Sequence, residues 1–199
     1  MTAADQRILE TALRNQQKAR QVIETSRVVE LWEALGMEVR PVGSLPSGLL
    51  MKHRDIDFHI YSDRPVAADG LTAMQRLADH IPLKRLAFND LLGTGEDCLE
   101  YHAWVLDEEN ELWQLDMIHI RRGSFYDGWF EKVTERIAAQ LTPETRLAIL
   151  KLKNATPESE KIMGIEYYQA VLRDGVRDYA DFLRWRREHP VTGIVDWMP

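Results

Sequence analysis

Hydrophobic residues recur at helical spacing along the first part of the chain. From Ala4 to Leu35 they form two apolar stripes, which predict helix over this segment. The stripes are made by Ile8, Leu9, Ala12 and Leu13 and then by Val22, Ile23, Val28, Val29, Trp32 and Leu35. We expect a break near Thr25, with Ser26 as the N-cap of a second helix, because serine favours that position. Gly36 suits the C-terminal end of the second helix.

The pattern then changes to the two-residue period of strands. Met37–Val42 predicts a short strand, and Asp55–Tyr61 alternates strictly between polar and apolar residues. Successive side chains of a strand point to opposite faces, so Asp55, Asp57 and His59 should share one face. The other face should carry the apolar residues and contact a core.

A helix followed by a further group of strands is predicted next. Residues 69–80 have an amphipathic helical pattern, and Leu83–Phe88 reads as a third strand. Cys98–Leu106 and Glu111–Ile120 are two strands that the polar turn at 107–110 joins into a hairpin.

From Trp129 onward the pattern is helical. Thr142 and Thr156 each precede a proline and an acidic residue, so both are predicted helix N-caps. Gly175 should end one helix, and the inner face of the last helix is expected to be formed by Val176, Tyr179, Ala180 and Leu183. The sequence therefore predicts an α/β (α+β) core over residues 1–125 and a helical C-terminal region over residues 126–199.

Composition narrows the class of protein. The net charge of −7 and the isoelectric point near 5.4 disfavour long nucleic acid as a partner, because that affinity depends on basic side chains. Cys98 is the single cysteine, so an internal disulfide and a cysteine-rich zinc site are excluded. The N-terminal sequence lacks the pattern of a secretory signal, and no apolar run is long enough to span a membrane. We therefore expect a cytoplasmic protein.

The chemistry is concentrated between residues 43 and 58. A Gly43-Ser44 turn precedes the Asp55-Ile-Asp57 strand, which displays two carboxylates on one face. Two such carboxylates repel each other and raise one pKa unless a cation lies between them. Mg²⁺ is commonly held by one or two carboxylates together with phosphate oxygens, and a turn that begins a helix favours phosphate through its N–H groups.

This arrangement resembles the nucleotidyltransferase superfamily that includes DNA polymerase β. Its members carry Gly-Ser or Gly-Gly after an apolar residue and then Asp-x-Asp or Asp-x-Glu between apolar residues, here Val42-Gly43-Ser44 and Asp55-Ile-Asp57-Phe58. The family's third carboxylate lies on a later neighbouring strand. Asp116 is the acidic residue within the strand Trp113–Ile120. The resemblance covers about residues 28–121 and implies the mixed β-sheet with flanking helices of that superfamily.

The resemblance also implies a reaction. Asp55, Asp57 and Asp116 would bind two Mg²⁺ ions and catalyse transfer of a nucleoside monophosphate from an NTP, with ATP the expected donor. Low mass and negative charge favour a small molecule or a protein side chain as the acceptor. Gly43 and Ser44 would contact the phosphates.

Basic residues near the motif are candidates for the triphosphate contact. Lys52 and Arg54 directly precede the aspartates with His53 between them, and Lys151 and Lys153 lie on a later predicted helix. We select Lys52, Arg54 and Lys151 as nucleotide-binding candidates.

Three histidines on the predicted strands are not selected as site residues. His59 shares the face of the aspartates and could contact substrate, but an ordinary structural role is favoured. Structural roles are also expected for His102 and His119 on the hairpin.

Two other functions stay open on the sequence. The chain could be a non-catalytic nucleotidyltransferase-like module that binds a nucleotide or a protein, although erosion of a carboxylate or of the Gly-Ser turn would then be expected. An RNA-tailing or tRNA-modifying enzyme would need a concentrated basic surface.

The triplet His53-Arg54-Asp55 matches the His-Arg-Asp motif of protein kinases. Ile60 stands where that motif requires asparagine, so a protein kinase is excluded.

Overall fold

The architecture is that of a computed structural model that describes residues 1–191 and 193–199. Its centre is a five-stranded sheet in the order β1-β2-β5-β4-β3. β2 and β5 are parallel neighbours, and the other three neighbouring pairs are antiparallel. The strands are β1 Glu38–Val42, β2 Asp55–Ser62, β3 Leu83–Asp90, β4 Cys98–Leu106 and β5 Leu112–Arg121.

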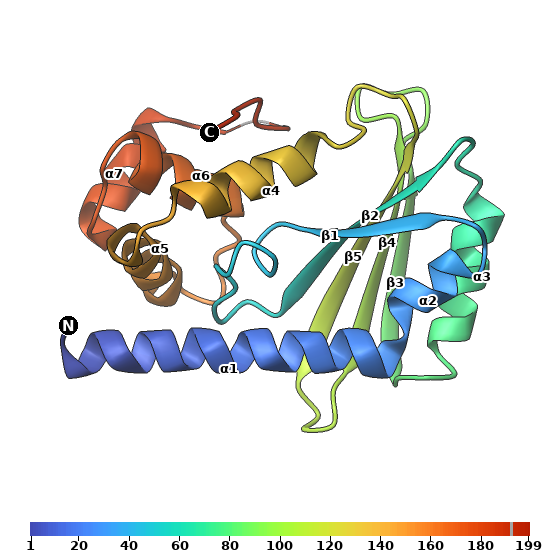
Figure 1. Ribbon diagram of the computed structural model, residues 1–199, viewed down its shortest axis with the longest axis horizontal. Coiled ribbons are helices and arrows are strands. Elements are labelled where there is room, and N and C mark those ends of the chain that lie inside the picture. Colours follow the sequence, from blue (N-terminus) through green and yellow to red (C-terminus); the bar gives the residue numbers. More distant parts are fainter. Residues whose placement is uncertain (192) are drawn as a thin grey trace.

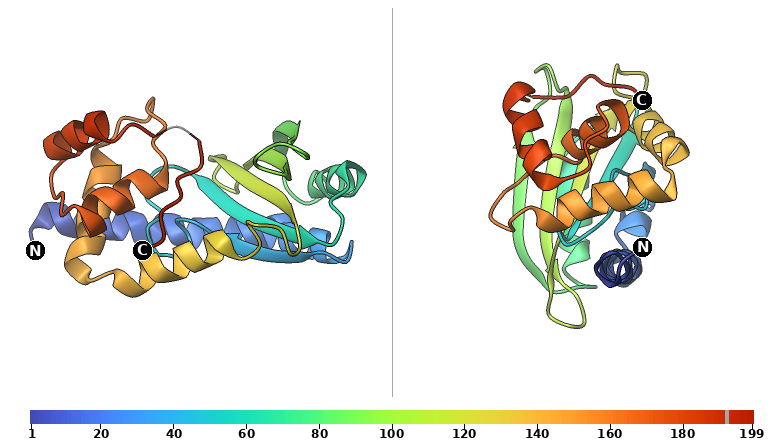
Figure 2. Two further views of the ribbon diagram at one scale, coloured as in Figure 1. Left: turned by 90° about the horizontal axis from the view of Figure 1, so that it is seen from above. Right: turned by 90° about the vertical axis from the view of Figure 1, so that its left-hand side faces the viewer.

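Helices lie on both sides of this sheet. The short helices α2 and α3 lie near one face, the helices after β5 gather on the other side, and α1 runs along the molecule between the two groups (Figures 1 and 2). The helices are α1 Ala3–Ser26, α2 Val28–Glu33, α3 Ala67–Leu77, α4 Trp129–Gln140, α5 Pro143–Ala155, α6 Gly164–Tyr168, the π-helix η1 Gln169–Arg173 and α7 Tyr179–Glu188. This mixed α/β arrangement confirms the predicted fold class.

Separate hydrophobic clusters stabilise the two ends of the molecule. The larger cluster fills the space between α2, α3 and the apolar sheet face, with Trp32, Phe58 and Trp113 completely buried. A second cluster packs α4 to α7 around Phe182 and Tyr167, whose rings stack with centroids 4.7 Å apart. The division into residues 1–125 and 126–199 stays a prediction, although each part of the chain supplies most of one cluster.

Two predicted helix caps are corrected by the structure. The first helix does break in the expected region, but Ser26 is the last residue of α1 and the N-cap of α2 is Arg27, whose φ of 53° is left-handed. Thr142 caps α5 as predicted, whereas Thr156 ends that helix instead of starting another. The Thr156 hydroxyl donates a hydrogen bond back to the carbonyl of Leu152 and lies 2.8 Å from the hydroxyl of Tyr167, so it is engaged at the end of α5.

The prediction for the inner face of the last helix is confirmed in part, because Val176 and Tyr179 pack against the second cluster. Phe182 and Trp185 are buried, while Ala180 is exposed and Val176 precedes the helix. The aromatic side chains bury more apolar area than alanine, so they determine which face turns inward. Within residues 1–191 and 193–199, none of the helices is both long and apolar enough to cross a bilayer.

Candidate active site

The parallel pairing of β2 with β5 brings the three predicted carboxylates together. Asp57 lies directly opposite Asp116, and Asp55 lies opposite Gln114 in the same register. Residues opposite one another in a sheet share a face, and the alternation along β2 puts Asp55 on that face as well. The structure therefore places Asp55, Asp57 and Asp116 side by side, on the sheet face opposite Trp32 and the larger core.

The Gly43-Ser44 turn packs directly against this carboxylate group. Gly43 has a φ of 75°, and a Cβ on it would lie 2.5 Å from Oδ2 of Asp57. Only glycine permits both that backbone conformation and that close approach. The Gly43 N–H donates to the Thr134 hydroxyl of α4 at 3.1 Å, which anchors the turn.

Ser44 carries an unused hydrogen-bonding group beside the carboxylates. Its side chain is buried, and its hydroxyl has no partner among the residues that the structure describes. Buried hydroxyls are normally hydrogen-bonded, so an unsatisfied one points to a ligand or ion. The turn therefore has the properties of a phosphate-binding site.

Loss of hydration and mutual repulsion act on the carboxylates of β2. Burial raises the pKa of Asp57 well above its usual range, and the charges of Asp55 and Asp116 raise it further. Burial also raises the pKa of Asp55. The positive charge of Lys153 acts in the opposite direction on the pKa of both groups. These are the electrostatics of a site that stabilises a cation.

Lys153 is the basic residue of α5 whose charge acts on the carboxylates. Its side chain is buried, and Nζ donates to the carbonyl of Leu49 at 3.0 Å and to the hydroxyl of Tyr168 at 3.3 Å. The sequence identified Lys153 only as an alternative to Lys151.

The three selected basic candidates have other partners. Lys151 forms an ion pair with Asp5 of α1 at 2.5 Å, on another side of α5 from Lys153. Arg54 pairs with Glu111 at 2.5 Å, and Lys52 donates to the carbonyl of Asn154 at 2.9 Å. The structure does not bring these three side chains into contact with the carboxylate group, and their nucleotide contacts stay predictions.

Asp116 is held by two side chains that the sequence did not identify as functional. His102 Nδ1 lies 2.5 Å from Oδ1 of Asp116, and the amide of Gln114 donates to the same oxygen at 2.7 Å. The hydrogen bond to Asp116 raises the pKa of His102 and favours its protonated form. The contact between His102 and Asp116 follows from the register of the β4–β5 hairpin, in which the two residues are directly opposite each other.

His59 and His119, the other two histidines considered from the sequence, lie on opposite faces of the sheet. His119 is completely buried on the core face, where its ring meets Trp32 edge-on, in agreement with a structural role. His59 is on the aspartate face, with Nδ1 3.3 Å from the hydroxyl of Tyr61 and 3.4 Å from Oε1 of Glu131. These contacts fix the orientation of the His59 ring.

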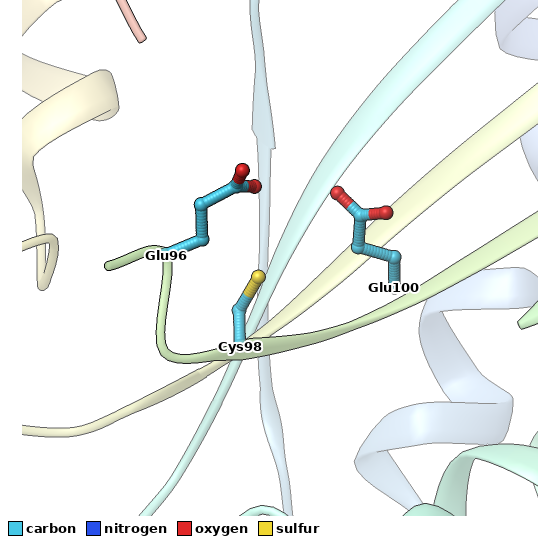
Figure 3. Close-up of side chains that lie close together, drawn as sticks. All are labelled: Glu96, Cys98 and Glu100. Atoms are coloured by element: carbon cyan, nitrogen blue, oxygen red, sulfur yellow. The ribbon is translucent and has the colours of Figure 1, made fainter. Parts of the chain in front are cut away.

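A second group of potential ligands lies on the same face at the start of β4. The side chains of Glu96, Cys98 and Glu100 point toward one another, and their ligand atoms all lie within 4.8 Å of each other (Figure 3). Among the described residues, this is the group of three His, Cys, Asp or Glu side chains whose ligand atoms come within that distance, and the three aspartates do not. Asp116 is turned toward His102 and Gln114, which accounts for part of this difference.

The chemistry of the aspartate group fits Mg²⁺. Carboxylate oxygens are the ligands that this hard cation prefers, and the unsatisfied Ser44 hydroxyl can donate a hydrogen bond to a phosphate oxygen. The Glu96–Cys98–Glu100 group mixes a thiol with carboxylates and fits Mg²⁺ less well.

Comparison with known proteins relates this geometry to solved structures. No protein-family model and no curated protein matches the sequence. The fold is similar to the Cid1 poly(U) polymerase with MgGTP bound, at 18% identity and a TM-score of 0.56 over 80% of this chain and 50% of that chain. Cid1 in complex with its short product ApU gives 16% identity and a TM-score of 0.55, over 80% of this chain and 48% of that chain.

A non-canonical poly(A) polymerase has the same architecture. The GLD-2–GLD-3 complex matches at 8% identity with a TM-score of 0.59, over 96% of this chain and 61% of that chain. The chain thus spans about half the length of the Cid1 structures that it resembles. The fold predicted from the carboxylate motif is confirmed: this chain has the polymerase-β-like nucleotidyltransferase fold.

Proposed function

We propose that the protein is a Mg²⁺-dependent nucleotidyltransferase that moves a nucleoside monophosphate from an NTP, with ATP the expected donor, to a hydroxyl group of a small molecule or a protein. The observation that carries the proposal is the pairing of Asp57 with Asp116 beside the Gly43-Ser44 turn. The solved structures of this fold support it, because Cid1 and GLD-2 are described as polymerases and Cid1 has been seen with MgGTP.

In this proposal Asp55, Asp57 and Asp116 hold two Mg²⁺ ions. When bound, Mg²⁺ neutralises charge on the transferring phosphoryl group and lowers the pKa of the acceptor hydroxyl. The remaining roles belong to the chain itself. Gly43 lets the backbone approach the phosphates, the Ser44 hydroxyl donates to a phosphate oxygen, and Lys153 supplies a fixed positive charge, which makes it a better candidate than Lys151.

His102 and Gln114 have positioning roles in the proposal. Both contact Oδ1 of Asp116, so they fix the orientation of this carboxylate, which lies opposite Asp57 in the sheet. In the transfer, the acceptor oxygen bonds to the α-phosphorus while the bond to pyrophosphate breaks, and the acceptor's proton is released. Preorganised carboxylates reduce the rearrangement that this step requires.

The first experiment measures ligand-induced stability. Mg²⁺ with a non-hydrolysable ATP analogue should raise the melting temperature, since saturation to about 100 times Kd stabilises a protein by about 2.7 kcal/mol. Asp57→Asn should lose this rise. Asp63→Asn is the matched control, because Asp63 follows the same strand but its side chain is 89% exposed.

The second experiment measures transfer. Label from an α-labelled NTP should move to an acceptor in a cell extract with the wild-type chain and with Asp63→Asn, and not with Asp57→Asn. Binding of the nucleotide without any transfer would favour the non-catalytic module instead. The cytoplasmic location expected from the sequence stays a prediction.

A further inference from the structure

A small cavity opens on the active-site face next to the aspartates. It has a volume of about 170 Å³, and its floor includes His59 of β2, Ile118 of β5 and Glu100 of β4. His59 and Ile118 are each two residues beyond Asp57 and Asp116, and Glu100 is two residues from His102 on the antiparallel strand. At about 3.3 Å per residue, this floor begins about 7 Å from the carboxylates.

The cavity lies where an acceptor would have to enter. The Gly43-Ser44 turn lies beyond the outer side of β2, so a triphosphate bound there would direct its leaving pyrophosphate away from β5 and β4. Attacking and leaving oxygens in phosphoryl transfer are roughly in line. The acceptor therefore approaches from the β5 and β4 side, and that is the side on which Glu96, Cys98 and Glu100 line the cavity.

The cavity is lined by acidic side chains. Its charged side chains are Glu96 and Glu100, and neither lysine nor arginine is among the described residues that line it. Glu96 is exposed and has no ion-pair partner in residues 1–191 and 193–199, whereas Glu100 accepts from the amide of Asn89 at 2.9 Å and lies 3.5 Å from Nε2 of His102. An uncompensated carboxylate at the mouth of a cavity favours a positively charged ligand.

The Cys98 thiol, which lies inside the cavity, is affected by the negative charge of the nearby carboxylates. Its side chain is 4% exposed and points between the two glutamates, and no hydrogen bond is made by its thiol within the described residues (Figure 3). Burial and the charges of Glu100, Glu96 and Asp97 raise the pKa of Cys98 to about 12. The thiol is therefore protonated at neutral pH, and the negative charge here is that of the carboxylates.

Aromatic rings complete the opposite wall. Tyr126 and Phe130 stack with centroids 5.7 Å apart, and Phe130 also meets His59 edge-on. Aromatic faces attract ammonium groups, and the attraction is stronger where water is excluded. The volume is below the 300 to 1,000 Å³ that is usual for a whole ligand, so the cavity suits one end of a molecule.

We propose that this cavity is the acceptor site and that the acceptor carries an amine, bound as an ammonium group between Glu96, Glu100 and the aromatic wall. The inference rests on the proposed transferase function. It narrows the acceptor to a cationic hydroxyl compound and assigns specificity to Glu96 and Glu100. An RNA acceptor is disfavoured, because the carboxylates would repel its phosphates.

The test separates possible acceptors by charge. The small-molecule fraction of a cell extract is divided by cation exchange into retained and unretained pools, and each pool is incubated with α-labelled ATP, Mg²⁺ and the full chain. Labelled product should form from the retained, cationic pool. Product from the unretained pool alone, or from a single-stranded RNA oligonucleotide, would overturn the amine assignment and leave the transferase function standing. Absence of product from every pool, from RNA and from the protein fraction of the same extract would contradict both proposals.

Two variants then test whether Glu96 contributes to binding of the acceptor. With the active pool, Glu96→Gln should raise the acceptor KM about tenfold and change kcat less than twofold, because Glu96 contacts the acceptor and not the reacting atoms. The thermal shift with Mg²⁺ and the ATP analogue should be unchanged. Glu33→Gln, on the exposed side of α2, is the control and should change neither constant. Equal KM values for Glu96→Gln and the wild type would contradict the proposal.

A metal ion is the competing occupant of the same group. Zn²⁺ alone, without nucleotide, is titrated against the full chain and against Cys98→Ser by calorimetry. We expect no stoichiometric Zn²⁺ binding that depends on Cys98. One tightly bound Zn²⁺ per chain, lost in Cys98→Ser, would show that the group is a metal site and would overturn the amine assignment.

Discussion

Two acidic groups share one face of the sheet, and they differ in what surrounds them. Asp55, Asp57 and Asp116 come from two neighbouring strands and lie beside an unsatisfied hydroxyl and a buried lysine. Glu96, Cys98 and Glu100 come from one strand and the turn before it, and they line a cavity with aromatic residues opposite. The surroundings of each group, more than the closeness of its ligand atoms, are the reason we propose Mg²⁺ for the aspartates and an ammonium group for the glutamates.

The largest effect on transfer is expected from loss of Lys153, the buried lysine that lies beside the aspartates and is not among the described residues that line the glutamate cavity. Lys153→Met should lower transfer by about 10²-fold or more, because a fixed positive charge near the transferring phosphates is lost. Lys151→Met should leave transfer unchanged, because Lys151 pairs with Asp5 of α1 and lies on another side of α5 from Lys153. Initial rates with α-labelled NTP decide between them. Equal losses in the two variants would contradict the assignment of Lys153.

A smaller effect is expected at the residue that links the two groups. His102 contacts Asp116 through Nδ1 and lies 3.5 Å from Glu100 through Nε2. His102→Ala should weaken Mg²⁺ binding about 10- to 100-fold, because residues behind metal ligands have effects of that size. The Mg²⁺ concentration at half-maximal thermal shift measures this, with His80→Ala in the exposed turn after α3 as the control. An unchanged midpoint would show that His102 does not orient Asp116.

The phosphate-binding turn offers a matched glycine pair. Gly43→Ala and Gly36→Ala both put alanine at a positive φ, of 75° and 82°, and each should cost about 1 to 2 kcal/mol of stability. A Cβ at Gly36 meets no atom within 4 Å, whereas at Gly43 it would displace Asp57. Only Gly43→Ala should therefore lose the thermal shift with Mg²⁺ and the ATP analogue. Retention of the shift in Gly43→Ala would contradict the close approach of the turn.

The smallest expected effect is a gain in stability. The pKa of Asp57 is raised in the folded protein, so its ionised form costs stability at any pH above the unfolded value, near 3.8. In metal-free protein at pH 7, Asp57→Asn should melt higher than the wild type, by roughly 2 to 4 °C for each kcal/mol relieved. The difference should shrink as the pH falls toward 3.8. A lower melting temperature for Asp57→Asn at pH 7 would contradict the repulsion among the carboxylates.

The sequence was sufficient for the features that depend on local periodicity. Strict alternation over Asp55–Tyr61 predicted which residues share the active-site face, and this needed no knowledge of how distant segments pack. That Asp116 lies on a strand beside them was implied by the resemblance to the nucleotidyltransferase superfamily, and the parallel pairing of β2 with β5 confirms it.

Features set by packing between elements could not be read from the sequence. Lys151 and Lys153 are two residues apart on a helix and point in different directions, so the choice between them depends on how α5 docks. His102 meets Asp116 only because of the register between β4 and β5. Thr156 resembles an N-cap until the hydrogen bond of its hydroxyl to Leu152 shows the end of a helix.

The central claim is that Asp57 and Asp116 together hold divalent cations beside the Gly43-Ser44 turn. A crystal grown with Mn²⁺ and a non-hydrolysable ATP analogue tests it most directly, because Mn²⁺ is located by its anomalous scattering. We expect anomalous peaks within coordination distance, about 2.0 to 2.2 Å, of Asp57 and Asp116, with the triphosphate against Ser44. Mn²⁺ bound between Glu96 and Glu100 instead, with the aspartates free of metal, would contradict it.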